Sequence, residues 1–472
     1  MKLADKILQS LRPAFSREAS YKWFTVVAIA FLCGPDKGGM AGIVRAIMLN
    51  FSCYSPIEHL FRSTAFTAET LLLYWRNAVL EHAPLYRLED GRAVIIGDGT
   101  KHAKEGLYMP GVKKHHQESG NSSKPSYIFG QLWGGIGICA SAGGASHCIP
   151  LSLTIQNGLA QAFGWDGREE RTESHVLQCV KAACEASMAI EGGAVGVFDS
   201  YFMSVEAVKA ALAAGMALIV RAKPSYAAYE KPERNNRGRP RKKGAKVKLG
   251  EVFEAEKGSF VEKGLELYGS TEAVRMHSKI LLWGKDLLQP ILFVFAESSR
   301  GKIIAACTDL SMAAETVLEL YGKRFSIESM FKALKQALLA FGAQFWTKAL
   351  PKLNRFAKKG DPDPLEAVSD RGVQKKILRA IESTERYMAI ACIAAGILQM
   401  IAMKYAQAGE KPSFRFVRTE HKKAPSVDSI AAGFKIILGL LPDNELFGTF
   451  QRLEGLRIKA DEIDVLSLRD IA

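Results

Sequence analysis

Apolar residues recur at helical spacing through the first 90 residues, and Pro, Gly and Ser positions separate the apolar runs. Side chains three or four positions apart share one face of a helix, so this pattern predicts amphipathic helices. We expect five of them, at residues 6–11, 21–31, 42–50, 56–66 and 67–82. Residues 1–90 are therefore predicted to form a helical N-terminal domain, with lysines and arginines interspersed along it.

Between residues 91 and 222 the pattern changes to short apolar runs bounded by turn residues, which predict strands. The expected order is strand, long loop, strand, strand, helix, strand, helix and strand. Strands are expected at residues 92–97, 127–138, 148–156, 195–198 and 216–221, and helices at 169–189 and 204–213. Three strands followed by helix, strand, helix and strand is the order of an RNase H-like fold, an α/β fold whose mixed sheet is flanked by helices.

The long loop is rich in basic side chains. Residues 101–125 carry eight Lys or His, namely Lys101, His102, Lys104, Lys113, Lys114, His115, His116 and Lys124. The histidines lack the companion Cys or His spacing of a metal site. We therefore expect solvated side chains that contact phosphate or substrate.

Residues 223–308 are predicted to form a basic arm followed by a β-rich insertion. Residues 221–248 hold eleven Lys or Arg and two Glu. Strands are then expected at residues 248–257, 273–283, 290–296 and 302–307. Trp283 lies in this region, either as a core side chain or as a platform for an unpaired base.

Two interpretations of the basic arm differ in what it binds. Arg237, Gly238, Arg239 and Pro240 resemble the core of an AT-hook, an extended segment that fits a narrow minor groove. The alternative is a generic arm that binds DNA phosphates without regard to sequence. Its candidate contacts are Arg237, Arg239, Arg241, Lys242 and Lys243.

The stretch from Asp309 to Phe341 has helical spacing. Four side chains on it, those of Tyr321, Arg324, Glu328 and Lys335, fall within an arc of about 60°. The neighbouring arc is apolar and predicts the buried side, with Ile327, Met330, Phe331, Leu334 and Leu338. A break after Tyr321, at Gly322, would still leave the later three on one face. Taken alone, the charged arc is also typical of a solvated helix with i,i+4 ion pairs.

Two aspartates upstream change that picture. Asp98 follows the predicted strand at residues 92–97, with a glycine on either side that allows a sharp turn, and Asp199 follows the predicted strand at residues 195–198. Strand ends are where an α/β sheet presents its chemistry. Two Asp and one Glu, with Tyr-x2-Arg-x3-Glu-x6-Lys around the Glu, resemble the DDE transposases of bacterial insertion sequences over roughly residues 90–405. Where many relatives have Trp after the arginine, this chain has Phe325.

The resemblance implies a catalytic mechanism. Asp98, Asp199 and Glu328 would be the catalytic carboxylates and hold two Mg²⁺ ions, or Mn²⁺, since hard carboxylate oxygens suit these ions. Water would free a 3′-OH, which would then attack target DNA. Arg324 and Lys335, being cations, would bind phosphate, and Tyr321 would donate to the same phosphate or stack.

The resemblance also implies the partners and the roles of both ends of the chain. Double-stranded DNA would be the partner, as terminal inverted repeats and as target, with a homodimer assembled on it. Residues 1–90 would bind the DNA ends, the alternative being a helical cap without a DNA role. Residues 309–405 would complete the catalytic core begun at residues 91–222, and the tail at 406–472 would serve assembly.

Charge and cysteine content agree with a nucleic-acid partner. Among 472 residues, Lys and Arg exceed Asp and Glu by 14, which favours a polyanionic partner, nucleic acid before membrane. Eight scattered cysteines without a CxxC pair indicate neither a zinc finger nor a disulfide framework, and suggest a cytoplasmic protein. The resemblance to bacterial transposases further implies association with the bacterial nucleoid. The apolar runs at residues 23–33 and 388–403 are short for a membrane span and are expected to be buried helices.

Three functions remain open. The first is a cut-and-paste DNA transposase. The second is a nuclease of the same fold that cuts without joining. The third is a sequence-specific DNA-binding protein with an inactive catalytic core, against which the intact set of acids argues.

Overall fold

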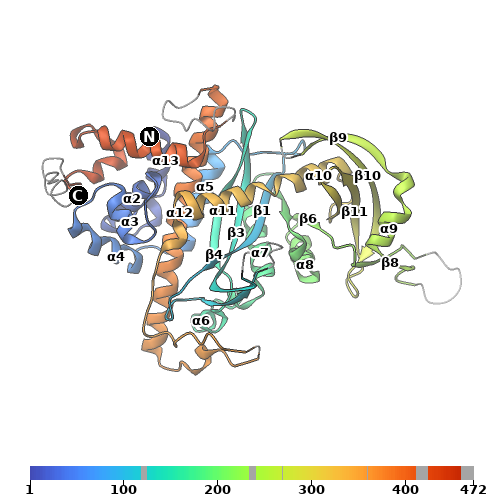
Figure 1. Cartoon of the computed structure of the whole chain (residues 1–472), viewed down its shortest axis with the longest axis horizontal. Coiled ribbons are helices and arrows are strands. Elements are labelled where there is room, and N and C mark those ends of the chain that lie inside the picture. Colours follow the sequence, from blue (N-terminus) through green and yellow to red (C-terminus); the bar gives the residue numbers. More distant parts are fainter. Residues whose placement is uncertain (118–124, 233–240, 268, 359, 411–423, 459–472) are drawn as a thin grey trace.

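The computed structural model describes residues 1–117, 125–232, 241–267, 269–358, 360–410 and 424–458. The protein has a mixed α/β architecture in which helices flank a large mixed sheet (Figure 1). Within the described residues the sheet has 12 strands: β1 Ala93–Ala103, β2 Lys113–His116, β3 Tyr127–Ala142, β4 Ala145–Ile155, β5 Ala194–Phe198, β6 Ala217–Arg221, β7 Ala227–Tyr229, β8 Lys246–Lys248, β9 Val261–Leu267, β10 Ser270–Trp283, β11 Gln289–Ser298 and β12 Gly301–Cys307.

The strand order is β2-β3-β1-β5-β6-β12-β11-β10-β7-β8, with β4 paired to β3 and β9 paired to β10. The central pairs β1–β5 and β5–β6 are parallel, whereas β3 is antiparallel to β1. The predicted β-rich insertion continues this sheet, because β12 pairs antiparallel with β6. The parallel strands β1, β5 and β6 therefore lie at the centre of the sheet. Antiparallel strands extend it on both sides, with β3 beside β1 and β12 beside β6.

The helical layer draws on both ends of the chain. The five expected N-terminal helices are present, as α1 Lys2–Ser10, α2 Glu18–Leu32, α3 Met40–Ala46, α4 Tyr54–Arg62 and α5 Ala68–His82. They pack with α12 Arg371–Ala408 and α13 Val427–Leu440 (Figure 1). The Asp5 carboxylate accepts a hydrogen bond from the backbone N–H of Thr449, which ties the first helix to the segment after α13. The first 90 residues are thus packed into a layer that is completed by residues 371–458.

Helix α12 is the one described helix that is long and apolar enough to cross a membrane, and 89% of its most apolar window is buried inside the fold. It packs on β4 and on α2, so the apolar run at residues 388–403 is a buried helix, as expected. At Gly396 a Cβ would lie 2.3 Å from the indole of Trp75, which in turn donates its N–H to the Pro150 carbonyl at 2.7 Å. Close helix–helix and helix–sheet contact therefore depends on that glycine.

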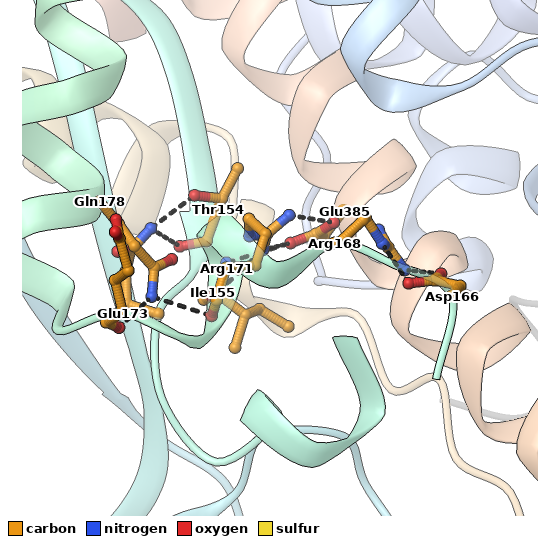
Figure 2. A network of polar contacts seen from close by, with 9 residues as sticks. Thr154, Ile155, Asp166, Arg168, Arg171, Glu173, Gln178 and Glu385 are labelled. Atoms are coloured by element: carbon orange, nitrogen blue, oxygen red, sulfur yellow. Dashed lines mark hydrogen bonds and ion pairs between the residues drawn. The ribbon is translucent and has the colours of Figure 1, made fainter. Parts of the chain in front are cut away.

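A buried polar network also fixes α12 to the sheet (Figure 2). Glu385 is only 5% exposed, and its carboxylate accepts a hydrogen bond from Arg171 at 2.6 Å. The backbone N–H of Ile155, at the end of β4, donates to the same carboxylate at 3.3 Å, while its carbonyl accepts from Arg171. A charge pair this well hydrogen-bonded orients the helix relative to the strand end.

Several local predictions were wrong. Residues 248–257 are not a strand: α9 Leu249–Ala255 occupies them, because Leu249, Val252 and Phe253 bury one helical face. Strand β9 was not foreseen, since four of its first residues are exposed and carry no apolar alternation. The expected loop at residues 101–125 begins inside β1 and contains β2. The remaining helices are α6 Ala160–Gly164, α7 His175–Met188, α8 Val205–Ala213, α10 Ala314–Lys323 and α11 Ser326–Lys332.

Candidate active site

Asp98 and Asp199 lie beside each other on neighbouring parallel strands. The register pairs Ile96 of β1 with Val197 of β5, and each aspartate is two residues further on. Since side chains two apart share a face of a strand, both carboxylates point to the same side of the sheet. Asp199 follows the end of β5 as predicted and caps the next turn, accepting from the Ser200 N–H at 2.6 Å.

Asp98, in contrast, is not at a strand end. β1 runs on to Ala103 because β3 continues to pair with it, from Asp98 opposite Gly135 to Ala103 opposite Gly130. The expected sharp turn at Gly97 and Gly99 is therefore absent. Gly97 is needed for packing instead, since a Cβ there would lie 2.0 Å from the ring of Phe198.

The same register decides which helix the aspartates face. A Cβ on Gly135 would contact Phe331 of α11, whereas a Cβ on the next residue, Gly134, would contact Cys179 of α7. The two helices consequently cover opposite faces of β3. Asp98 is opposite Gly135 in the antiparallel pair, and cross-strand partners share a face, so Asp98 points towards α11.

Helix α11 brings Glu328 to that face. The predicted apolar arc is confirmed, because Ile327, Met330, Phe331, Leu334 and Leu338 are all buried. The expected single helix is interrupted between α10 and α11, at Arg324 and Phe325, rather than after Tyr321. The turn after α11 is a π-helix over Ala333–Ala337, a local widening that often accompanies functional sites.

Arg324 joins the acids. Its guanidinium is 3.0 Å from the carboxylate of Asp98 and 3.6 Å from that of Glu328. Arg324 is 16% and Glu328 49% exposed at the side chain, so the contact extends from the sheet to solvent. The ring of Tyr321 lies below, with its centroid 5.9 Å from the guanidinium carbon. Tyr321 is buried, and burial raises its pKa to about 12, so it stays a neutral phenol beneath Arg324.

Burial controls the charge on Asp98. Removal from water raises the pKa of its carboxyl to about 6, and the nearby charges of Asp199 and Glu328 act in the same direction. Arg324 and the N–H of Gly99, which donates to the carboxylate at 2.7 Å, oppose the shift. The three predicted acids therefore share one electrostatic environment.

Lys335 extends this face along β1. Its ammonium donates to the Thr100 hydroxyl at 2.5 Å and to the Lys101 carbonyl at 3.2 Å. Thr100 was not singled out from the sequence, although it is two residues after Asp98 and so shares its face. Arg324, at Asp98, and Lys335, at Thr100, thus contact two successive positions on the same face of β1.

Two basic residues of the predicted solvated loop are buried. Lys104 is 8% and His115 is 6% exposed. The Lys104 ammonium donates to the carbonyls of Phe341 and Ala343, and burial lowers its pKa to about 8. Lys104 thus anchors the segment after α11 to the end of β1, and is not available for phosphate.

The basic arm is placed at the other edge of the sheet. Arg237 and Arg239 lie outside the described residues. Arg241, Lys242 and Lys243 are exposed between β7 and β8, with the Lys243 ammonium 4.4 Å from the ring centroid of Tyr229. β8 ends the strand order, far from β1 (Figure 1). Trp283, on β10, is 8% exposed and belongs to the core.

The chemistry of the acids suits a divalent cation, but their arrangement here favours Arg324. Oxygen ligands from three carboxylates are the donors that Mg²⁺ and Mn²⁺ prefer. In the part of the chain that the structure describes, no three His, Cys, Asp or Glu side chains are grouped closely enough to hold a metal. The guanidinium instead takes the cation position beside Asp98. Metal binding would require Arg324 to move off that carboxylate.

No protein-family profile and no curated protein matches this chain. Its function is therefore inferred from the residues themselves and from the geometry described above.

Proposed function

We propose that this protein is a DDE transposase with an RNase H-like catalytic core, which cuts the ends of a DNA element and joins them to target DNA. The observation that carries the proposal is the convergence of Asp98 and Asp199, from adjacent parallel strands, on the face covered by α11, where Arg324 contacts both Asp98 and Glu328. These residues are 230 positions apart in the chain, from 98 to 328. Acidic residues spaced by chance along a sequence would not be expected to come together at one place in the fold.

The carboxylates and cations would have separate tasks. Asp98, Asp199 and Glu328 would hold Mg²⁺ or Mn²⁺, which when bound activates the attacking oxygen and stabilises the leaving oxygen. Arg324, released from Asp98, and Lys335, next to it along β1, would bind the phosphates on either side of the scissile bond. Tyr321 would support the Arg324 guanidinium from below.

The rest of the molecule would engage the DNA at a distance from the acids. The exposed cations between β7 and β8 would add phosphate contacts at the far edge of the sheet. The N-terminal helices would contact the element ends, and a homodimer would bring two ends together. Cutting by water would release a 3′-OH, and attack of that oxygen on a target phosphodiester would complete joining.

A nuclease without joining activity and an inactive DNA-binding protein remain the alternatives. The experiment uses labelled linear DNA from the flanks of the protein's own coding sequence, a supercoiled target plasmid, and Mg²⁺. We expect cleavage at defined positions and covalent transfer of label to the plasmid. Cleavage without transfer would favour the nuclease, and specific binding without cleavage would favour the inactive protein.

Variants assign the chemistry to the proposed residues. Asp98→Ala, Asp199→Ala and Glu328→Ala should each abolish cleavage while leaving DNA binding in EDTA. Asp286→Ala is the matched control, because Asp286 is an exposed carboxylate on the turn between β10 and β11. Wild-type cleavage by purified Asp98→Ala would refute the assignment.

A further inference from the structure

A cavity of about 730 Å³ lies between the N-terminal helices, α12 and the segment that follows the π-turn. Four cationic side chains line it, from three parts of the chain: Lys37, Arg62, Lys376 and Arg379. All four are exposed. The lining contains one carboxylate, that of Glu58, which forms an ion pair with Arg62. The cavity thus carries a net excess of three positive charges.

This charge is available to a ligand. Within the described residues, Lys37, Lys376 and Arg379 form no ion pair. Lys376 and Arg379 are three positions apart on α12 and so project from one face of the helix towards the cavity. Cations gathered without internal partners favour an anionic ligand.

The cavity also has an exposed indole. Trp346 is 59% exposed, whereas Trp75, Trp133 and Trp283 are buried. Its position is set by its neighbours in sequence. The Phe345 ring packs on Phe61 and Tyr387, and the Thr347 N–H donates to the Tyr108 carbonyl at 3.0 Å. A solvent-facing aromatic beside cations, with its backbone position fixed by packed neighbours, is an arrangement that can stack on a nucleic-acid base.

The floor of the cavity is built by close backbone contact. A Cβ on Gly38 would lie 2.4 Å from the Cα of Gly342, so neither segment has room for a side chain there. The buried Lys104 ammonium holds the carbonyls on both sides of Gly342. The wall that carries Trp346 is therefore fixed to the end of β1, the strand that carries Asp98.

We infer that this cavity binds one unpaired nucleotide of a DNA strand, with the base stacked on Trp346 and the adjoining phosphates held by Lys37, Lys376 and Arg379. Its volume suits a group of that size. The cavity lies close in sequence to the proposed phosphate-binding residues. The Lys335 ammonium, proposed to bind phosphate, lies 5.6 Å from the ring centroid of Phe341, and Trp346 is five residues after Phe341. The inference rests on the proposed function for its DNA substrate.

Tryptophan fluorescence tests the stacking, because Trp346 is the most exposed indole in the described regions. The full-length protein is titrated with a short oligothymidylate in EDTA, so that no cleavage occurs. We expect saturable quenching that is lost in Trp346→Ala, with binding about five-fold or more weaker, since each stacked base contributes to affinity on that scale. Trp346→Phe, which keeps an aromatic face, should restore most of the affinity.

Paired variants on α12 test the charge. The double variant Lys376→Gln and Arg379→Gln should weaken oligonucleotide binding and lower its salt dependence. The control, Arg371→Gln with Lys375→Gln, removes the same charge from exposed positions of the same helix that do not line the cavity, and should bind as wild type does at moderate salt.

The outcomes separate the two proposals. Unchanged binding in Trp346→Ala, or equal weakening in the two double variants, would overturn the cavity assignment even if the protein cleaves DNA. Equal quenching by oligoglutamate would identify an acidic peptide as the ligand. Binding of thymidine monophosphate as tight as that of the oligonucleotide would show that adjoining phosphates contribute nothing, and would overturn the proposed phosphate contacts. If the wild-type protein does not cleave DNA but its fluorescence is still quenched through Trp346, the result would count against the transposase and would support the cavity assignment.

Discussion

At the scale of single residues, the site is a balance between burial and charge at Asp98. Its side chain is 23% exposed, which is enough removal from water to disfavour the carboxylate. Arg324 offsets part of that cost by an ion pair at 3.0 Å. The aspartate is thus held in a state that favours any cation able to compete with the guanidinium, and its protonation should be coupled to folding.

This coupling between protonation and folding determines the direction in which stability changes with pH. The folded chain holds the Asp98 proton up to a pKa of about 6, whereas the ordinary value is 3.8, so ionisation costs stability as the pH rises through this window, by at most about 3 kcal/mol. The Asp98→Asn variant cannot ionise. We expect its melting temperature, relative to wild type in EDTA, to rise between pH 4.5 and pH 8. Asp286→Asn, at an exposed site, should show no such trend, and a trend of equal size there would contradict the burial argument.

Lys335 allows a second test at this scale. Its ammonium lies on β1 at Thr100, two residues beyond Asp98, where a DNA phosphate would pass. Lys335→Ala should weaken binding of a pre-cleaved DNA end several-fold more than binding of random duplex, measured by anisotropy. The control is Lys323→Ala, because the Lys323 ammonium lies 4.0 Å from the ring centroid of Tyr86 and not at the acids. Equal effects on both DNAs would make Lys335 an ordinary surface charge.

At the scale of elements, two contacts place α11, the helix that carries Glu328. Phe331 of α11 fills the space that Gly135 leaves open on β3, and Lys104 anchors the residues after the π-turn. Helix α12 supports the opposite end of this arrangement by packing on β4. Small residues at these crossings let backbone and rings approach closely. Replacing them with larger residues should therefore disturb the packing of the whole layer.

Gly396 is the clearest such crossing. Gly396→Ala would place a Cβ 2.3 Å from Trp75 in α5 and 3.0 Å from Ile149 in β4, so overpacking should cost about 1–3 kcal/mol and lower the melting temperature. Gly439→Ala, in α13, has no atom within 4 Å of its new Cβ and should be neutral or stabilising by up to about 1 kcal/mol. Thermal unfolding of the two variants checks the contrast. Equal melting temperatures would mean that α12 can shift to make room.

At the scale of the whole molecule, the two aspartates and the basic arm lie at different parts of one sheet. Asp98 is on β1 and Asp199 directly follows β5, whereas Arg241, Lys242 and Lys243 are exposed beside β8, at the end of the strand order. A DNA duplex bound at both places would have to follow the sheet. The net charge of +14 would supply long-range attraction for such binding.

Salt dependence measures the contribution of the arm. Neutralising Arg237, Arg239, Arg241, Lys242 and Lys243 together should lower the slope of log affinity against log salt by about 0.9 for each DNA phosphate that the arm no longer neutralises. Cleavage at saturating DNA should persist. If Arg237 to Arg241 instead occupy an A·T-rich minor groove, the variant should also lose preference for A·T-rich over G·C-rich duplex. An unchanged slope on both duplexes would show that the arm does not touch DNA.

Much of the architecture is encoded locally. The strand at β5 and the buried arc of α11 follow from apolar spacing, because burial of one face imposes a period of two or 3.6 residues. The five N-terminal helices and the buried α12 could be predicted from the sequence for the same reason. The position of Asp199, directly after a short buried strand, also follows from its neighbours in the sequence.

Tertiary structure decided what local spacing does not encode. Asp98 lies inside β1 because β3 pairs past it, and that pairing partner is about 35 residues away in the chain. The contact of Arg324 with Asp98 and that of Lys335 with Thr100 each join residues more than 220 positions apart. Lys104 and His115 looked solvated from their charge but are buried, since burial depends on which segments pack above them. The sequence thus determined which faces and strand ends exist, and packing of distant segments determined which side chains meet there, because that meeting depends on contacts without any local period.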